Sequence, residues 1–213
     1  MSGTITDELL KRYPLLATSI HENLIEAYQF MKESFEKGGK VLIAGNGGSA
    51  ADAAHIVGEL MKSFKFARPC CDDLRKRLMD VQPVYGEYIA NHIQGALPAM
   101  SLCEQVALNT AFSNDSEPAL CYAQQINGYG RAGDVFLGIS TSGNSSNIVY
   151  AAVAAKAKGM KVIGLTGKND SKLSGLADVC IKAPATETYL VQEYHLPIYH
   201  CLCSMLEEHF FSN

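Results

Sequence analysis

Apolar residues along the chain fall into two kinds of pattern. Short unbroken runs predict four buried strands, over Lys40–Gly45, Asp134–Ser140, Lys161–Gly167 and Asp178–Ala183. Longer segments with apolar residues at helical spacing predict helices over residues 1–38, Ser49–Lys62, Asn147–Lys158 and Val191–Phe210. Strands that alternate with helices of about a dozen residues are typical of a parallel sheet covered on both faces. The chain is therefore predicted to be an α/β protein, with a doubly wound parallel sheet flanked by helices and a long N-terminal helix.

One segment, Cys70–Gly95, interrupts this alternation. It carries the alternating charges of DDLRKRLMD and then Pro83 and Gly86. We expect an amphipathic helix and a second short helix here, inserted between two layers of the fold. Two interpretations are open: a solvated insertion, or a lid or oligomer contact near the active site. Nothing in the pattern indicates a second domain, so residues 1–213 are interpreted as one.

Length and composition narrow the class of protein. The 213 residues are enough for one domain with a sizeable core. The 22 acidic residues outnumber the 18 basic ones, which argues against a general nucleic-acid binder. No apolar run approaches the roughly 18 residues of a membrane span, and the N-terminus lacks the pattern of a signal peptide. The seven cysteines are odd in number and lack paired CxxC spacing, which favours reduced thiols in a cytoplasmic protein.

A glycine-rich loop, GNGGSA over Gly45–Ala50, joins a predicted strand to a predicted helix. Its glycines allow the backbone to approach a ligand closely, and the helix N-terminus behind it attracts an anion. The loop nearly matches the GxGxxA pattern of dinucleotide-binding folds. That pattern requires an acidic residue about 20 positions further on, where this chain has SFKFARP. A nucleotide cofactor is therefore not expected.

A second loop, STSGNSS over Ser140–Ser146, also joins a strand to a helix. Five of its seven residues are Ser or Thr, and their hydroxyls together with helix N-terminal amides suit a phosphate monoester. An ordinary helix cap is the simpler alternative, but it needs only one hydroxyl. Neither loop contains a lysine or the GxxxxGKS/T pattern, so a nucleotide triphosphatase is not expected.

Two pairs of polar residues indicate a possible metal site. His55 and Glu59 lie four residues apart on one predicted helix, and therefore on one face of it. Gln192 and His200 lie eight apart on the last helix, within roughly 80° of each other around its axis. Two imidazoles, a carboxylate and an amide oxygen could complete a site for zinc or another divalent metal. The rival ligands on the last helix are Glu193 and His195.

Taken together, these motifs resemble the sugar-isomerase (SIS) domain family, and in particular its phosphoheptose isomerase branch. The resemblance rests on GNGGSAADAAHIVGEL over Gly45–Leu60, ND at Asn114–Asp115, GISTSGNSSNI over Gly138–Ile148 and VQEYHLPIYH over Val191–His200. It implies a flavodoxin-like three-layer sandwich, and conversion of sedoheptulose 7-phosphate to glycero-manno-heptose 7-phosphate for bacterial surface heptose. It also implies a homotetramer with sites built between subunits.

The resemblance further implies roles for individual residues. The implied substrate-binding residues are Asn46, Gly47, Gly48, Ser49, Glu59, Asn114, Asp115, Ser140, Thr141, Ser142, Ser145 and Gln192. The implied ligands of one divalent ion per subunit, most often zinc, are His55, Glu59, Gln192 and His200. Glu59 and His200 are also the implied acid–base pair. The chain departs from the family pattern in its 70–95 insertion, in Ala54 and in Pro197, where we expect a kink in the last helix.

Three hypotheses about function follow. The first is a ketose-to-aldose isomerase that moves a proton between C1 and C2 of a seven-carbon sugar phosphate through an enediol. The second is an isomerase of another phosphosugar. The third is a non-catalytic tetrameric adaptor of the bacterial replication initiator, since such adaptors resemble this family but lose the metal and acid–base positions. Glu59 and His200 are both present, which favours an enzyme.

Overall fold

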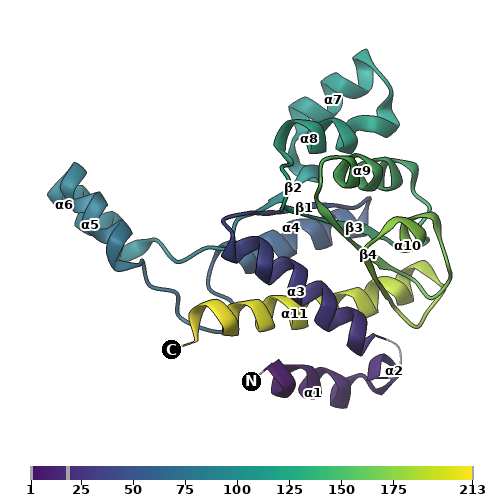
Figure 1. Cartoon of the computed structure of the whole chain (residues 1–213), viewed down its shortest axis with the longest axis horizontal. Helices are drawn as coiled ribbons and strands as arrows, with labels where there is room; N and C mark the ends of the chain where they lie inside the picture. Colours follow the sequence, from purple (N-terminus) through teal and green to yellow (C-terminus); the bar gives the residue numbers. More distant parts are fainter. Residues whose placement is uncertain (1, 18–19, 213) are drawn as a thin grey trace.

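Five strands form one parallel sheet through the middle of the molecule (Figure 1). The computed structural model describes residues 2–17 and 20–212. The strands are β1 (Val41–Ala44), β2 (Ala99–Ser101), β3 (Val135–Ser140), β4 (Lys161–Thr166) and β5 (Val179–Lys182). Their order across the sheet is β2-β1-β3-β4-β5, and every neighbouring pair is parallel.

Helices surround the sheet. In chain order they are α1 (Ser2–Arg12), α2 (Pro14–Ala17), α3 (His21–Glu36), α4 (Gly48–Met61), α5 (Asp72–Val81), α6 (Pro83–His92), α7 (Val106–Asp115), α8 (Cys121–Tyr129), α9 (Ser146–Ala157), α10 (Lys172–Leu176) and α11 (Thr188–Phe211). Two short 3₁₀ turns, Leu102–Glu104 and Pro118–Leu120, precede α7 and α8. None of the helices that the structure describes is long and apolar enough to cross a membrane.

The side chains of each strand alternate between two hydrophobic layers, as a parallel sheet covered on both faces requires. In β1, Val41 and Ile43 join the layer beneath α3, α4 and α11, whereas Leu42 joins the layer beneath α8, α9 and α10. The helices therefore cover both faces of the sheet. The predicted α/β class, with a doubly wound sheet in three layers, is confirmed.

The four predicted strands are confirmed, with ends that differ by only one residue. The fifth strand, β2, was not predicted because it has three residues, directly follows Pro98 and pairs with a single neighbour at the sheet edge. The helices α7 and α8 also lack a strong apolar pattern in the sequence. The last predicted helix is confirmed, and it continues through Pro197, so the expected kink does not interrupt it.

The prediction of one helix over residues 1–38 was wrong. The described residues of this segment form three helices, and the first boundary falls at Tyr13, directly before Pro14. Proline disfavours helical backbone in the residue before it, and its own fixed φ suits the start of a new helix. Residues 1, 18 and 19 of the predicted helix lie outside the described residues. The apolar side chains of this segment, including Leu24 and Met31, lie in the core of the same chain.

The two helices predicted for the 70–95 insertion are confirmed as α5 and α6, but their predicted position between two layers was wrong. They pack against each other as a hairpin that projects from the body of the molecule (Figure 1). Gly86 permits this packing, because a Cβ there would lie 2.2 Å from the carbonyl oxygen of Leu78. The outer side of α6 exposes the large side chains of Val84, Tyr85, Tyr88 and Ile89.

Candidate functional site

The two predicted loops meet at one edge of the sheet. One loop follows β1 and the other follows β3, which are adjacent parallel strands with Ala44 paired to Gly138. The helix after β1 (α4) lies on one face of the sheet and the helix after β3 (α9) on the other. Such a switch point, at the carboxyl ends of the strands, is where open α/β sheets bind ligands.

A cavity of about 340 Å³ lies between the two loops and the start of α11. Its lining residues are Asn46, Gly47, Gly48, Ser49, Ile139, Ser140, Thr141, Ser145, Thr188 and Gln192. The cavity therefore brings together most of the substrate-binding residues expected from the sequence. Thr188 was not anticipated, because it stands at the first residue of α11, before the apolar pattern of that helix begins.

Hydrogen bonds fix the two loops relative to each other. The side-chain amides of Asn46 and Asn147 donate to each other's oxygen atoms, over 3.0 and 2.8 Å. The hydroxyls of Ser140 and Ser145 are 3.1 Å apart. A Cβ at Gly48 would lie 2.6 Å from Nε2 of Gln192, so this glycine lets the amide pack onto the first loop. The role of Asn147 depends on a contact across 101 residues of sequence, which no local pattern reveals.

Four of the expected substrate-binding residues do not line this cavity, and one of them, Glu59, lies in the cluster between α4 and α11 described below. Ser142 is exposed and lines a neighbouring cavity of about 260 Å³ together with Lys168. Asn114 and Asp115 are exposed at the end of α7, where the Asn114 amide donates to Asp115 over 2.9 Å. Within a single chain, the ND pair is therefore separate from the two loops.

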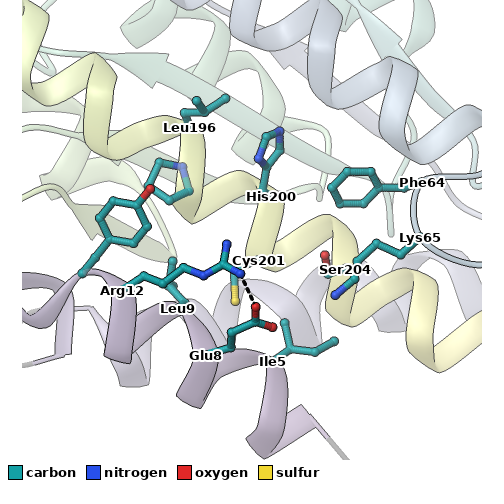
Figure 2. A pocket seen from close by; sticks show the side chains of 12 residues that line it. Ile5, Glu8, Leu9, Arg12, Phe64, Lys65, Leu196, His200, Cys201 and Ser204 are labelled. Atoms are coloured by element: carbon teal, nitrogen blue, oxygen red, sulfur yellow. Dashed lines mark hydrogen bonds and ion pairs between the residues drawn. The ribbon is translucent and has the colours of Figure 1, made fainter.

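Three residues of the two predicted polar pairs, His55, Glu59 and His200, come together where α4 packs against α11. His55 Nε2 lies 3.1 Å from an Oε of Glu59, and its ring centroid lies 5.0 Å from that of His200. His200 also contacts the ring of Phe64, at 5.4 Å between centroids. Figure 2 shows His200 beside Phe64 at a groove of about 330 Å³ between α1 and α11.

Glu59 and His200 differ in their electrostatic surroundings. Burial lowers the pKa of His200, and the neighbouring His55 lowers it further, while Glu59 acts in the opposite direction. The imidazole of His200 is therefore neutral near pH 7. The Glu59 carboxyl is mostly buried, and the Lys62 ammonium lies 3.8 Å from its Oε2 atom. The cluster pairs a carboxylate with a neutral imidazole, which suits proton transfer.

Two residues that sequence reasoning missed hold His55 in place. The Tyr199 hydroxyl donates to Asp52 over 3.3 Å and lies 3.0 Å from Nδ1 of His55. Burial raises the pKa of both Tyr199 and Asp52, so the phenol stays protonated. Such a contact to one ring nitrogen fixes the orientation of an imidazole and which nitrogen carries the proton. The only sequence signal is position: Asp52 lies one turn before His55, and Tyr199 precedes His200.

The donor atoms suit a divalent metal only in part. Glu59 Oε2 and His200 Nε2 are buried without a hydrogen-bond partner, as expected of atoms that take an external ligand. However, within residues 2–17 and 20–212 no group of three or more His, Cys, Asp or Glu side chains is arranged to hold an ion. Gln192 lies at the loop cavity instead. A metal therefore stays a prediction.

The two rival ligands on α11 lie elsewhere. Glu193 is exposed. His195 is fully buried, and its Nε2 lies 3.2 Å from the backbone oxygen of Thr166, at the end of β4. His195 therefore supports the packing of α11 on the sheet.

Comparison with known proteins agrees with this geometry. The SIS domain model matches residues 7–82 and 78–167. A phosphoheptose isomerase of Aneurinibacillus thermoaerophilus is 39% identical over 97% of this chain and 86% of that protein. One from Rhodospirillum rubrum is 36% identical over 87% of this chain and 85% of that protein. The solved structure of a phosphoheptose isomerase from Francisella tularensis superimposes with a TM-score of 0.76, at 28% identity and over 97% and 96% of the two chains.

The chain therefore belongs to the SIS domain family. Within that family its place is in the phosphoheptose isomerase branch, because curated isomerases of that name are 32–39% identical to it over most of its length.

The buried His195 predicts a specific pH dependence of stability. Burial lowers the pKa of His195 to about 4 from an ordinary value of 6.5. Between these values the unfolded chain binds a proton that the folded chain does not, so stability falls as the pH falls. His195 should remove about 2 kcal/mol from the free energy of unfolding between pH 7 and pH 5. Urea unfolding should show this loss in the parent and not in His195→Gln; equal pH slopes would contradict it.

Proposed function

We propose that this chain isomerises sedoheptulose 7-phosphate to glycero-manno-heptose 7-phosphate. The observation that carries the proposal is the course of two adjacent helices. Helix α4 begins at the loop cavity with Gly48 and carries Glu59 in its last turn. Helix α11 begins at the same cavity with Thr188 and carries His200 three turns later. One end of the substrate would thus bind at the loops and the other would reach the acid–base cluster.

The distance between the loop cavity and the acid–base cluster suits a long phosphosugar. Gln192 lines the loop cavity, and His200 follows eight residues later on α11, which is about 12 Å along the helix axis. An extended seven-carbon chain with its phosphate ester spans about 10 Å, at roughly 1.2 Å per bond. A phosphate held by the loops would therefore place C1 and C2 near Glu59 and His200.

The phosphate would bind to the loop that follows β3. The hydroxyls of Ser140 and Ser145 face each other there, and Thr141 lines the same cavity. The N-terminus of α9 directly behind them contributes free backbone N–H groups and a favourable dipole. Hydroxyls and amides that converge in this way bind an anion without a lysine.

The isomerisation requires two groups with different tasks. Glu59 would remove the proton from C1, since its buried carboxylate Oε2 atom has no hydrogen-bond partner. His200, neutral with one N–H because its pKa is lowered, would pass that proton to the C2 carbonyl oxygen as the C1–H bond breaks, which gives the enediol. The protonated Glu59 would then return its proton to C2 while His200 takes the hydroxyl proton of O1, so that C1 becomes the aldehyde of the aldose.

We also propose one divalent ion per subunit, zinc. His55, Glu59 and His200 would hold it in the cluster, and Gln192 would have to turn from the loop cavity toward them to be the fourth ligand. Two of these ligands contribute the unpartnered buried atoms described above. When bound, the ion would act as a Lewis acid toward the oxygens of the substrate.

The assembly is proposed to be a homotetramer in the cytoplasm. The exposed apolar and tyrosine side chains on the outer side of α6 support self-association, because free surfaces rarely carry such a stripe. All seven cysteines, which lie within the described residues, are free thiols, as a reducing compartment favours.

The loop that binds phosphate can be tested with two neighbouring serines. Ser145→Ala removes a hydroxyl that lines the cavity, and a hydrogen bond to a charged group contributes about 1.5–3 kcal/mol. Calorimetry should show sugar phosphate binding weakened by roughly ten- to a hundredfold. Ser146→Ala is the matched control, because Ser146 is exposed and does not line the cavity. Equal affinity of both variants would refute the assignment.

The acid–base pair can be tested with two conservative variants. Glu59→Gln keeps the shape of the side chain but removes the base, and His200→Asn removes the imidazole. Each should lower turnover of sedoheptulose 7-phosphate by roughly two to four orders of magnitude. The control is His195→Gln, which changes an imidazole on α11 that faces Thr166 instead of the cluster.

Metal analysis of the same proteins tests the ion. The parent should contain one zinc per subunit, and His200→Asn should contain less, while His195→Gln keeps it. A parent that turns over the sugar but binds no divalent ion would contradict the metal proposal alone. A parent with neither activity nor metal would favour the non-catalytic adaptor.

The proposed assembly predicts the mass in solution. Light scattering at micromolar concentration should give four copies of the 23.0 kDa chain. A single copy under the same conditions would contradict the tetramer.

A further inference from the structure

A buried ion pair lies behind the proposed catalytic residues, at the junction of α4, its following loop and α11. The side chains of Arg68 and Glu207 are both fully buried, and Arg68 Nε donates to Glu207 over 2.8 Å. The Arg68 guanidinium also donates to the backbone oxygens of Leu60 and Glu59, over 2.7 and 2.9 Å. These two carbonyls belong to the last turn of α4, where a helix leaves its oxygens without partners. Arg68 therefore caps the turn that carries Glu59.

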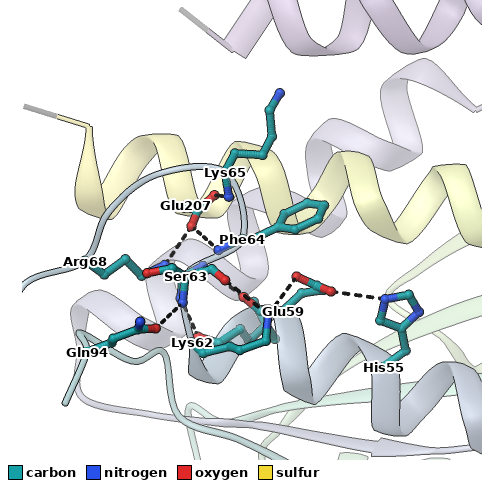
Figure 3. A network of polar contacts seen from close by, with 10 residues as sticks. His55, Glu59, Lys62, Ser63, Phe64, Lys65, Arg68, Gln94 and Glu207 are labelled. Carbon is teal, nitrogen blue, oxygen red and sulfur yellow. Dashed lines mark hydrogen bonds and ion pairs between the residues drawn. The ribbon is translucent and has the colours of Figure 1, made fainter. Parts of the chain in front are cut away.

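Glu207 holds the loop that follows α4 in the same way. Its two carboxylate oxygens accept hydrogen bonds from the backbone N–H groups of Phe64 and Lys65, over 2.7 and 2.6 Å (Figure 3). Those backbone bonds and Arg68 lower the pKa of Glu207, so the carboxylate stays charged despite its burial. The loop is thereby fixed with the ring of Phe64 against His200.

The position of Glu207 links this network to the second catalytic residue. Glu207 follows His200 by seven residues on α11, which is close to two full turns, so both lie on the face that packs against α4 and its loop. Arg68, at one end of the network, binds the backbone of Glu59. Glu207, at the other end, belongs to the same helix as His200. The network therefore connects the backbone of Glu59 with the helix that carries His200.

Stability alone does not explain such a pair. The free energy needed to remove two charges from water often exceeds the favourable energy of their attraction. A protein with apolar side chains of similar volume in their place can be equally stable. What apolar side chains cannot do is bind two helix carbonyls and two loop amides at once. The fork of an arginine is suited to this task, whereas a lysine presents one point charge.

We propose that Arg68 and Glu207 are positioning residues that set the placement of Glu59 relative to His200 for proton transfer. This inference rests on the proposed isomerase function. Both side chains are fully buried and neither lines the loop cavity, so their loss should slow the chemical step without weakening binding there.

The test is steady-state kinetics of Arg68→Lys, which keeps the charge opposite Glu207 but cannot reach both carbonyls. We expect kcat to fall by about ten- to a hundredfold, as a misplacement of about 1 Å can cost this much. KM should stay within about twofold, since the loops are unchanged. Glu207→Gln is the second variant if Arg68→Lys does not fold, because its one amide oxygen can still accept from one loop N–H while the charge opposite Arg68 is removed.

The matched control breaks an ion pair at the opposite edge of the sheet. Lys40 Nζ lies 2.6 Å from Asp134, before β1 and β3 begin. Lys40→Met should lower the melting temperature while kcat stays that of the parent. If the folded Arg68→Lys and Glu207→Gln proteins retain the parent kcat, or lose no more than Lys40→Met, the positioning role is wrong. A parent without isomerase activity overturns the proposed function, and this inference with it.

Discussion

The parallel pairing of β1 with β3 is the constraint on which the rest of the site depends. It places two strand-to-helix loops side by side at the carboxyl edge of the sheet, although they are nearly a hundred residues apart in the chain. It also sends α4 and α9 to opposite faces, which opens a cavity between them. Without that register, the serine cluster and the GNGGSA loop would be two unrelated helix starts.

The packing of α4 against α11 turns this loop cavity into part of a candidate active site. Both helices start at the cavity and run on to the cluster of His55, Glu59 and His200. Buried polar contacts hold the cluster from two sides, with Tyr199 against His55 and Arg68 against the backbone of Glu59. A polar or charged side chain such as Tyr199 or Arg68 is costly to bury unless it has hydrogen-bond partners. These polar contacts hold the cluster in addition to the core packing.

Much of this arrangement could be predicted from the sequence, because the features concerned are local. Buried parallel strands are continuous apolar runs, and the residue pairs at helical spacing required no knowledge of the fold. Other features depend on distant contacts. In the sequence, Arg68 is one basic residue among several in the segment after α4. Its partner, Glu207, lies 139 residues further on and is known only from the structure. Asn147 and Tyr199 are hidden in the same way, since their partners lie on other elements. The broken N-terminal helix is different: Pro14 was visible, but the apolar spacing continues across it and favoured one helix.

The most direct measurement of the central claim is NMR of sedoheptulose 7-phosphate incubated with the protein in deuterated water. If Glu59 carries a proton between C1 and C2, the aldose should form, and deuterium should appear at its C2 as the carboxylate exchanges with solvent. Glu59→Gln should abolish both signals. A parent protein that forms no aldose and exchanges no carbon-bound hydrogen would contradict the account.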